Sequence, residues 1–130
     1  MSKLLRIGSV TLVLLVILAM SLISNVAAAG YNKNSQVTCP SNVDAASWLN
    51  WWDQPPSSSG HTVGDLYWWN TASQSWVSMA GGSNDDYGST GNAQVDLHHQ
   101  YVAGQWWEHG SHTASFFSGT QTSNSTVYCP

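Results

Sequence analysis

Hydrophobic and polar side chains alternate along several short stretches of this chain, with the period of a β-strand. Within residues 94–102, Val95, Leu97 and Tyr101 share one face, and the intervening positions are mostly polar. Residues 65–70 and 75–79 are rich in aromatic and β-branched side chains on either side of a four-residue turn. The pattern predicts a hairpin there, in which Trp76 pairs with a ring on the opposite strand.

Residues 41–52 have a different spacing. Ser41 and Asp44 fit a capping box, and aromatic residues then recur at helical intervals before Pro55 and Pro56 end the segment. The spacing favours one short helix, and a strand over residues 46–53 is the alternative, because tryptophan is common in sheets.

The segments together predict an all-β chain, a small antiparallel β-sandwich or jelly-roll-like domain with one short helix near its start. Loops rich in glycine, serine, asparagine and proline separate the expected strands. The expected core residues are Trp48, Leu49, Leu66, Trp68, Trp76, Val95, Leu97, Tyr101, Phe116 and Val127.

The first residues have the pattern of an export signal. Lys3 and Arg6 precede an apolar run over residues 10–23, and three alanines follow at 27–29. The run is shorter than the roughly 20 residues that span a bilayer. We expect residues 1–29 to be a cleaved signal peptide and residues 30–130 to be a single secreted domain without a stable membrane span.

Cys39 and Cys129 are the two cysteines of the chain and lie near the ends of the expected mature domain. In a secreted protein, an isolated pair of this kind predicts a disulfide. It places the first and last strands side by side.

The expected mature domain carries very little positive charge, which limits its possible partners. Lys33 is the single Lys or Arg after residue 29, against the seven acidic residues of the chain. A surface with so little positive charge does not neutralise a phosphate backbone, so nucleic acid is excluded as a partner. Nothing in the sequence calls for a cofactor.

Tryptophan doublets at 51–52, 68–69 and 106–107 carry the strongest functional signal. On a strand, adjacent side chains point to opposite faces, so one indole of each doublet is expected to face outward. The candidate ligand-binding residues are Trp51, Tyr67, Trp69, His98, Trp107 and His109.

Histidines and carboxylates between residues 94 and 117 offer weaker alternatives. Glu108, His109 and His112 are candidate metal ligands, although no recognised metal motif is present. Ser111 with a neighbouring histidine has the residue types of a nucleophile and its base, and Glu108 with Asp96 or Asp65 those of a glycosidase pair. No catalytic motif is matched, so the sequence favours a non-catalytic protein. Asn84, Asp85 and Asp86 are hard oxygen donors, but a solvated turn explains them as well.

Aromatic rings combined with amides, carboxylates and few cations suit a neutral glycan, because indole faces match the apolar faces of sugars. In general composition the chain resembles carbohydrate-binding modules. The sequence therefore favours a secreted module that binds a glycan or cell-surface polymer. One alternative is a self-assembling extracellular structural subunit. The other is a secreted antimicrobial protein, because the segment HGSHTAS resembles part of the lactococcin-type bacteriocins.

Overall fold

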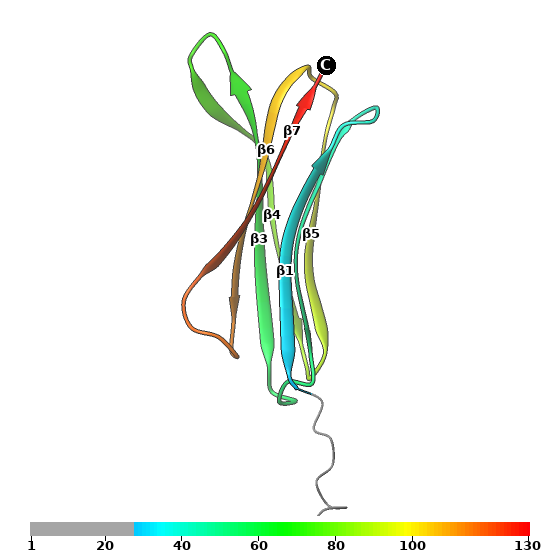
Figure 1. Ribbon diagram of the computed structural model, residues 1–130, viewed down its shortest axis with the longest axis vertical. Helices are drawn as coiled ribbons and strands as arrows, with labels where there is room; N and C mark the ends of the chain where they lie inside the picture. Colours follow the sequence, from blue (N-terminus) through cyan, green and yellow to red (C-terminus); the bar gives the residue numbers. More distant parts are fainter. Residues whose placement is uncertain (1–27) are drawn as a thin grey trace, which may run out of the picture.

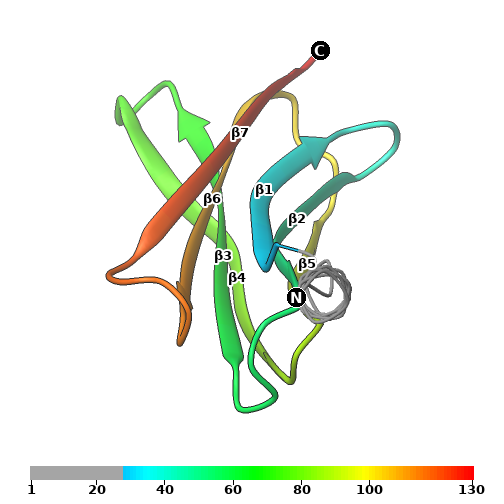
Figure 2. The same ribbon diagram turned by 60° about the horizontal axis from the view of Figure 1, so that its bottom comes forward.

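The computed structural model describes residues 28–130, which form seven antiparallel strands in two packed sheets (Figures 1 and 2). The predicted antiparallel β-sandwich is confirmed. The expected signal peptide lies almost wholly outside the described residues, and within residues 28–130 no helix is long and apolar enough to cross a membrane. The three-stranded sheet has the order β1-β2-β5, and the four-stranded sheet β4-β3-β6-β7, with bounds β1 Gly30–Thr38, β2 Val43–Trp52, β3 Ser59–Asn70, β4 Ser75–Tyr87, β5 Gly91–His99, β6 Gly104–Ala114 and β7 Gln121–Cys129.

The segment predicted as a helix is strand β2, so that expectation is wrong and the strand alternative is correct. Val43, Leu49 and Trp51 point inward, together with the small residues Ala45 and Ser47. Small or polar inward positions and outward tryptophans hide the two-residue period. Trp48 and Trp52 are four residues apart, a spacing that fits one face of a strand as well as one face of a helix.

The interior formed by residues 28–130 holds two separate hydrophobic clusters. The larger is built around Leu66, Val95 and Trp106, and the smaller around Leu49 and Trp51 with Phe116 packed against it. Of the expected core residues, Leu49, Leu66, Val95 and Leu97 are buried, and Trp68, Phe116 and Val127 pack against a cluster. Three expected core residues are elsewhere: Trp48 and Trp76 are half-buried on outer faces, and Tyr101 is exposed.

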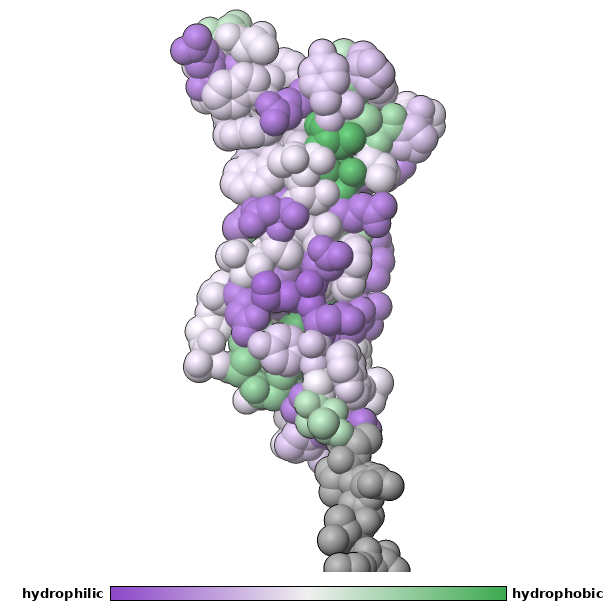
Figure 3. Space-filling model, in the orientation of Figure 1, coloured by the Kyte–Doolittle hydropathy of each residue, from purple (hydrophilic) through white to green (hydrophobic). Residues whose placement is uncertain are grey.

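Edge strands β1 and β7 belong to different sheets but run side by side in Figure 1. Side chains close this seam: Lys33 Nζ donates to the Thr122 carbonyl at 2.5 Å, and the Val37 amide donates to Ser125 Oγ at 3.2 Å. Figure 3 shows, in the same view, polar side chains across the middle of the molecule, with apolar patches above and below. The face seen in this view thus has the same division into two apolar regions as the interior.

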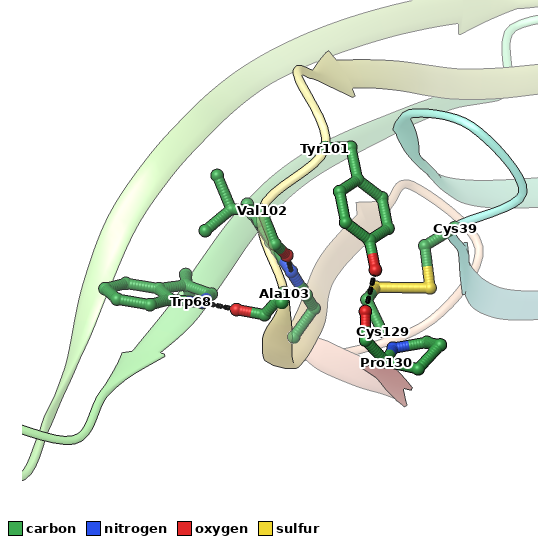
Figure 4. The surroundings of a disulfide bond; sticks show 8 residues. Cys39, Trp68, Tyr101, Val102, Ala103, Cys129 and Pro130 are labelled. Atoms are coloured by element: carbon green, nitrogen blue, oxygen red, sulfur yellow. Dashed lines mark hydrogen bonds between the residues drawn. A yellow bond between two sulfur atoms is a disulfide. The ribbon is translucent and has the colours of Figure 1, made fainter.

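The predicted disulfide between Cys39 and Cys129 is present, with Cα atoms 6.0 Å apart. It joins the residue that follows β1 to the last residue of β7 (Figure 4). In the same region the Tyr101 hydroxyl donates to the Pro130 carbonyl, and Trp68 Nε1 donates to the Ala103 carbonyl at 3.1 Å. These contacts fix the chain between β5 and β6 against Pro130 on one side and against β3 on the other.

Candidate functional site

Four aromatic side chains meet on the outer face of the four-stranded sheet, at the end where the β3–β4 hairpin leans away from the other strands (Figure 1). Tyr67 and Trp69 belong to β3, Trp76 to β4 and Trp107 to β6. The strand register places Tyr67 opposite Trp107 and Trp69 opposite Trp76. We call these four residues the aromatic row.

Each ring of the aromatic row contacts another ring. Tyr67 stacks on Trp107 with centroids 5.0 Å apart, and Trp76 joins Trp107 at 5.6 Å. Trp69 meets Trp76 edge to face at 5.3 Å, as the hairpin prediction requires. All four side chains are half-buried, so the row is a continuous surface rather than part of the core. A contiguous aromatic surface of this kind commonly marks an interaction site.

Polar groups on one side of the row hold its central indole. Asn124 Oδ1 accepts a hydrogen bond from Trp107 Nε1 at 3.1 Å and lies 2.8 Å from His109 Nδ1. The His109 ring also packs 5.3 Å from the Trp107 ring. Asp65 stands opposite His109 on β3. The row therefore combines ring faces with preoriented amide, imidazole and carboxylate groups.

The structure unites four of the six predicted ligand-binding residues: Tyr67, Trp69, Trp107 and His109. The other two lie elsewhere. Trp51 is only 1% exposed and donates to the Gly88 carbonyl in the turn between β4 and β5, so the expectation that it faces outward is wrong. In that doublet Trp52 is the outward indole, at 40% exposed. His98 is on the outer face of the opposite sheet, paired with Asp44 at 2.7 Å.

Ser111, His109 and Asn124 line up as a nucleophile, a base and an orienting group would. Ser111 Oγ lies 3.4 Å from His109 Nε2, and Asn124 holds His109 Nδ1. Transfer of an acyl group also needs donors for the developing oxyanion. Strand β6 is paired on both sides around Ser111, with Val63 and with Thr122 as register partners, so its backbone amides are engaged in the ladders. The arrangement orients His109, but the paired backbone of β6 around Ser111 is not available to bind an oxyanion.

Carboxylate pairs of the glycosidase type do not form either. Glu108 is fully buried and points into the sandwich, whereas Asp96 is exposed on the opposite sheet and Asp65 is on the outer face of β3. The metal candidates Glu108 and His112 point inward while His109 points outward, so they do not share a site. Within residues 28–130 no three His, Cys, Asp or Glu side chains are grouped as a metal ion would require.

Beneath the row, a belt of polar side chains separates the two hydrophobic clusters; all are buried except the half-buried Ser123. Ser47 Oγ donates to Glu108 Oε1 at 2.6 Å and is hydrogen-bonded to Ser35 Oγ at 2.6 Å. Ser35 Oγ is in turn 2.5 Å from Ser123 Oγ, which is 2.8 Å from His112 Nε2. Thr62 Oγ1, 3.1 Å from His112 Nδ1, completes the belt.

The belt has one hydrogen-bond direction when Glu108 is ionised, because each hydroxyl has a single hydrogen to donate. Ser47 gives its hydrogen to Glu108, so it accepts from Ser35, which accepts from Ser123. Ser123 then accepts from His112 Nε2–H, and Thr62 donates to Nδ1. This assigns the Nε2–H tautomer to His112.

Burial keeps both titratable groups of the belt uncharged over a wide pH range. It raises the pKa of Glu108 to about 7, opposed by the Ser47 hydrogen bond and reinforced by nearby Asp65. Oε2 of Glu108 has no hydrogen-bond partner among residues 28–130, which further disfavours the carboxylate. Burial lowers the pKa of His112 to about 4, helped by Lys33 and His109.

Gly110 provides the space in which the serines of the belt meet. A Cβ at this position would lie 2.5 Å from Ser47 Oγ, 2.6 Å from Ser123 Oγ and 2.7 Å from Ser35 Oγ. We expect Gly110→Ala to lower the free energy of unfolding by about 1–3 kcal/mol through overpacking. Denaturant unfolding measures the change, with Ser111→Ala at the neighbouring outward position as the control. Equal stability of the two variants would contradict the contact.

The comparisons with known proteins place no family on this chain. No protein-family model matches it, and no curated protein sequence is detectably similar. A crystal structure of BslA, a bacterial hydrophobin, aligns over 82% of this chain and 97% of its own, with 12% sequence identity and a TM-score of 0.40. A similarity at this level carries no functional argument.

Sequence reasoning missed several residues of the site. The sequence predicts Trp76 in the core, whereas the irregular register between Leu66 and Tyr67 places it on the outer face, opposite Trp69. Asn124 lies in β7 beside the aromatic row, on a strand whose first residues are too polar to give a strand signal. The serines of the belt gave no local signal, since only the packing of the two sheets brings together residues as distant as Ser35 and Ser123.

Proposed function

We propose that this chain is a secreted, non-catalytic module that binds a neutral glycan or another hydroxyl-rich cell-surface polymer through the aromatic row. The observation that carries the proposal is the contact chain from Tyr67 through Trp107 and Trp76 to Trp69 on one outer face. Aromatic rings stack on the apolar faces of sugar rings, and the neighbouring Asn124, His109 and Asp65 supply donors and acceptors for hydroxyl groups.

Charge supports an uncharged ligand. Lys33 is the single Lys or Arg in the described part of the chain, and it is engaged with the Thr122 carbonyl at the β1–β7 seam. The aromatic row therefore has no lysine or arginine for a phosphate or sulfate group. A disulfide that closes a long loop fits an oxidising, extracellular location.

Trp107→Ala tests this proposal, because Trp107 is the central ring of the row. We expect affinity for the best ligand of a neutral-glycan array to fall by roughly tenfold or more, the usual effect of losing a central aromatic anchor. Isothermal titration of the purified oligosaccharide measures the affinity, and circular dichroism verifies that the variant is folded.

Tyr87→Ala is the matched control. Tyr87 is 71% exposed at the opposite end of the β3–β4 ladder, where its register partner is Ser59. The Tyr87→Ala variant should bind the oligosaccharide as tightly as the unchanged protein does. An equal loss in both variants, or none in Trp107→Ala, would refute the role of the row. Concentration-dependent oligomers that disappear in Trp107→Ala would assign the row to self-association instead.

A further inference from the structure

We propose that the outer face of the three-stranded sheet is a second binding surface for the same class of neutral polymer, so that the domain bridges two polymer segments. The inference rests on the proposed function for the class of ligand and on separate residues for the site. In a two-sheet sandwich the outer faces point in opposite directions (Figure 2). A ligand on this face therefore does not touch the aromatic row.

Strand β2 runs along the middle of this second face and supplies its aromatic groups. Its outward residues include Ala46, Trp48, Asn50 and Trp52. Trp48 and Trp52 lie about 13 Å apart along the strand, so a chain of linked rings contacts both and a single small ring does not. The amides around them come from the flanking strands and are Asn32, Asn34 and Gln36 of β1 and Asn92 and Gln94 of β5.

The indole of Trp52 is supported on one face by the backbone of β1. A Cβ on Gly30 would lie 2.4–2.9 Å from three atoms of the Trp52 indole, so the indole packs directly on the bare backbone of Gly30. The residue still exposes 40% of its surface. An indole supported from one side and open on the other is the arrangement that stacking against a sugar ring requires.

Hydrogen bonds between side chains fix the amides of the face in advance. Asn50 Nδ2 donates to Asn32 Oδ1 at 3.3 Å. Along β5, Asn92 Nδ2 donates to Gln94 Oε1 at 3.3 Å, and Gln94 Nε2 donates to Asp96 Oδ1 at 2.8 Å. Each amide group carries two N–H hydrogens and two acceptor lone pairs, so these bonds leave further donors and acceptors for a ligand. Preorientation lowers the entropic cost of binding.

A hollow of about 400 Å³ opens on the same face over Ala46, bordered by Gln36, Asp96 and the Asp44–His98 pair. Its volume is at the lower end of the range for small-molecule sites. Trp48 follows two residues later on the same face, about 7 Å further along β2. The hollow and the two indoles thus form one track along the strand.

The chemical groups on this face indicate which class of ligand it binds. It presents amides, carboxylates and indoles, and it lacks the lysine and arginine that an anionic polymer would need. It has too many polar groups for the close-packed apolar centre of a stable protein interface. A hydroxyl-rich uncharged chain satisfies both the ring platforms and the amides.

Two binding faces on opposite sides make the domain a cross-linker. When two segments of polymer are held at once, the second contact benefits from a high effective concentration, and soluble chains are joined into a network. The measurable signature is turbidity that is greatest at an intermediate ratio of protein to polymer and falls when either component is in excess.

The test compares three variants of the full domain. Trp52→Ala removes the platform, Ala46→Leu fills the hollow without removing any group, and Trp107→Ala disables the opposite face. Titration with a short neutral oligosaccharide should give two sites per chain for the unchanged protein and one for each of Trp52→Ala and Trp107→Ala. Ala46→Leu should weaken the second site by roughly tenfold. All single-face variants should lose the turbidity peak with soluble polymer.

The outcomes separate the two proposals. The second face would be overturned if the unchanged protein, Trp52→Ala and Ala46→Leu all showed the same single site and the same turbidity. That result would leave the aromatic row intact. If Trp52→Ala lost all binding and Trp107→Ala lost none, the result would support this face and refute the row. Sedimentation verifies that the protein is monomeric under these conditions, since turbidity that depends on protein dimers would also overturn the two-faced monomer.

Discussion

As the pH rises from 4 to 8, the free energy of unfolding of Glu108→Gln should increase by about 3 kcal/mol relative to that of the unchanged protein. Glu108 has a pKa of about 7 in the folded state and 4.5 as its ordinary value, so the folded state holds its proton more tightly. Its contribution to stability is complete below pH 4.5 and is lost as the pH rises to 7. The variant lacks this loss and should gain stability relative to the unchanged protein over that interval.

His112→Asn should show the opposite behaviour. The pKa of His112 is about 4 in the folded state against an ordinary value of 6.5, so its contribution is complete above pH 6.5 and is lost as the pH falls to 4. Between pH 4.5 and 6.5 the two effects nearly cancel in the unchanged protein. Folding there converts a carboxylate and an imidazolium into a neutral acid and a neutral imidazole, without net proton uptake.

Guanidinium denaturation of the two single variants and the double variant, from pH 4 to pH 8, measures these slopes. The double variant is the control and should follow the unchanged protein with a constant offset, because the opposing terms are removed together. Glu108→Gln should also be less stable by a constant amount at every pH, because its buried amide hydrogens lack an acceptor. Parallel curves for Glu108→Gln and the unchanged protein would contradict the raised pKa.

The tautomer of His112 gives an atomic readout of the same titration. A proton on Oε2 of Glu108 would be a buried donor without a partner, whereas one on Oε1 can be donated to Ser47. The serines of the belt then turn, and Nδ1–H of His112 donates to Thr62. Nitrogen chemical shifts should report Nε2–H above about pH 7 and Nδ1–H below it, in step with the carboxyl of Glu108.

Replacing both Cys39 and Cys129 by serine should lower the free energy of unfolding by about 4 kcal/mol, from the entropy of closing so long a loop. The bond spans 90 residues and joins edge strands of different sheets. The other links at this seam include side-chain hydrogen bonds, such as that from Lys33 to Thr122, and the packing of Val37 and Val127 in one hydrophobic cluster. Because small domains have only about 5–15 kcal/mol of stability, a large share is at risk.

Denaturation with and without a reducing agent measures this effect. Tyr101→Phe, which removes the nearby hydrogen bond to the Pro130 carbonyl, is the control and should cost about 1 kcal/mol. A disulfide variant no less stable than Tyr101→Phe would show that the seam holds without the covalent link.

Much of the architecture was accessible from the sequence. The alternation around Val95 and Leu97, the hairpin that pairs Trp69 with Trp76 and the disulfide between the terminal strands follow from local patterns and composition. The alternation of side chains also predicts that one ring of the Trp106–Trp107 doublet faces outward, and the structure shows that Trp107 is on the surface while Trp106 is in the core. The same alternation predicts that Tyr67 and Trp69 share one face of their strand, as they do in β3.

The tertiary structure decided what no local pattern records. Residues on one strand alternate faces by themselves, but which face becomes interior depends on the sheet that packs against it. Trp51 and Trp52 therefore exchanged their expected places, and Trp48 became an outward ring on a strand rather than a core residue on a helix. The buried belt is wholly tertiary, because its serines, Glu108 and His112 come from strands of both sheets. Burial, rather than any neighbour in the sequence, is the main cause of their shifted pKa values.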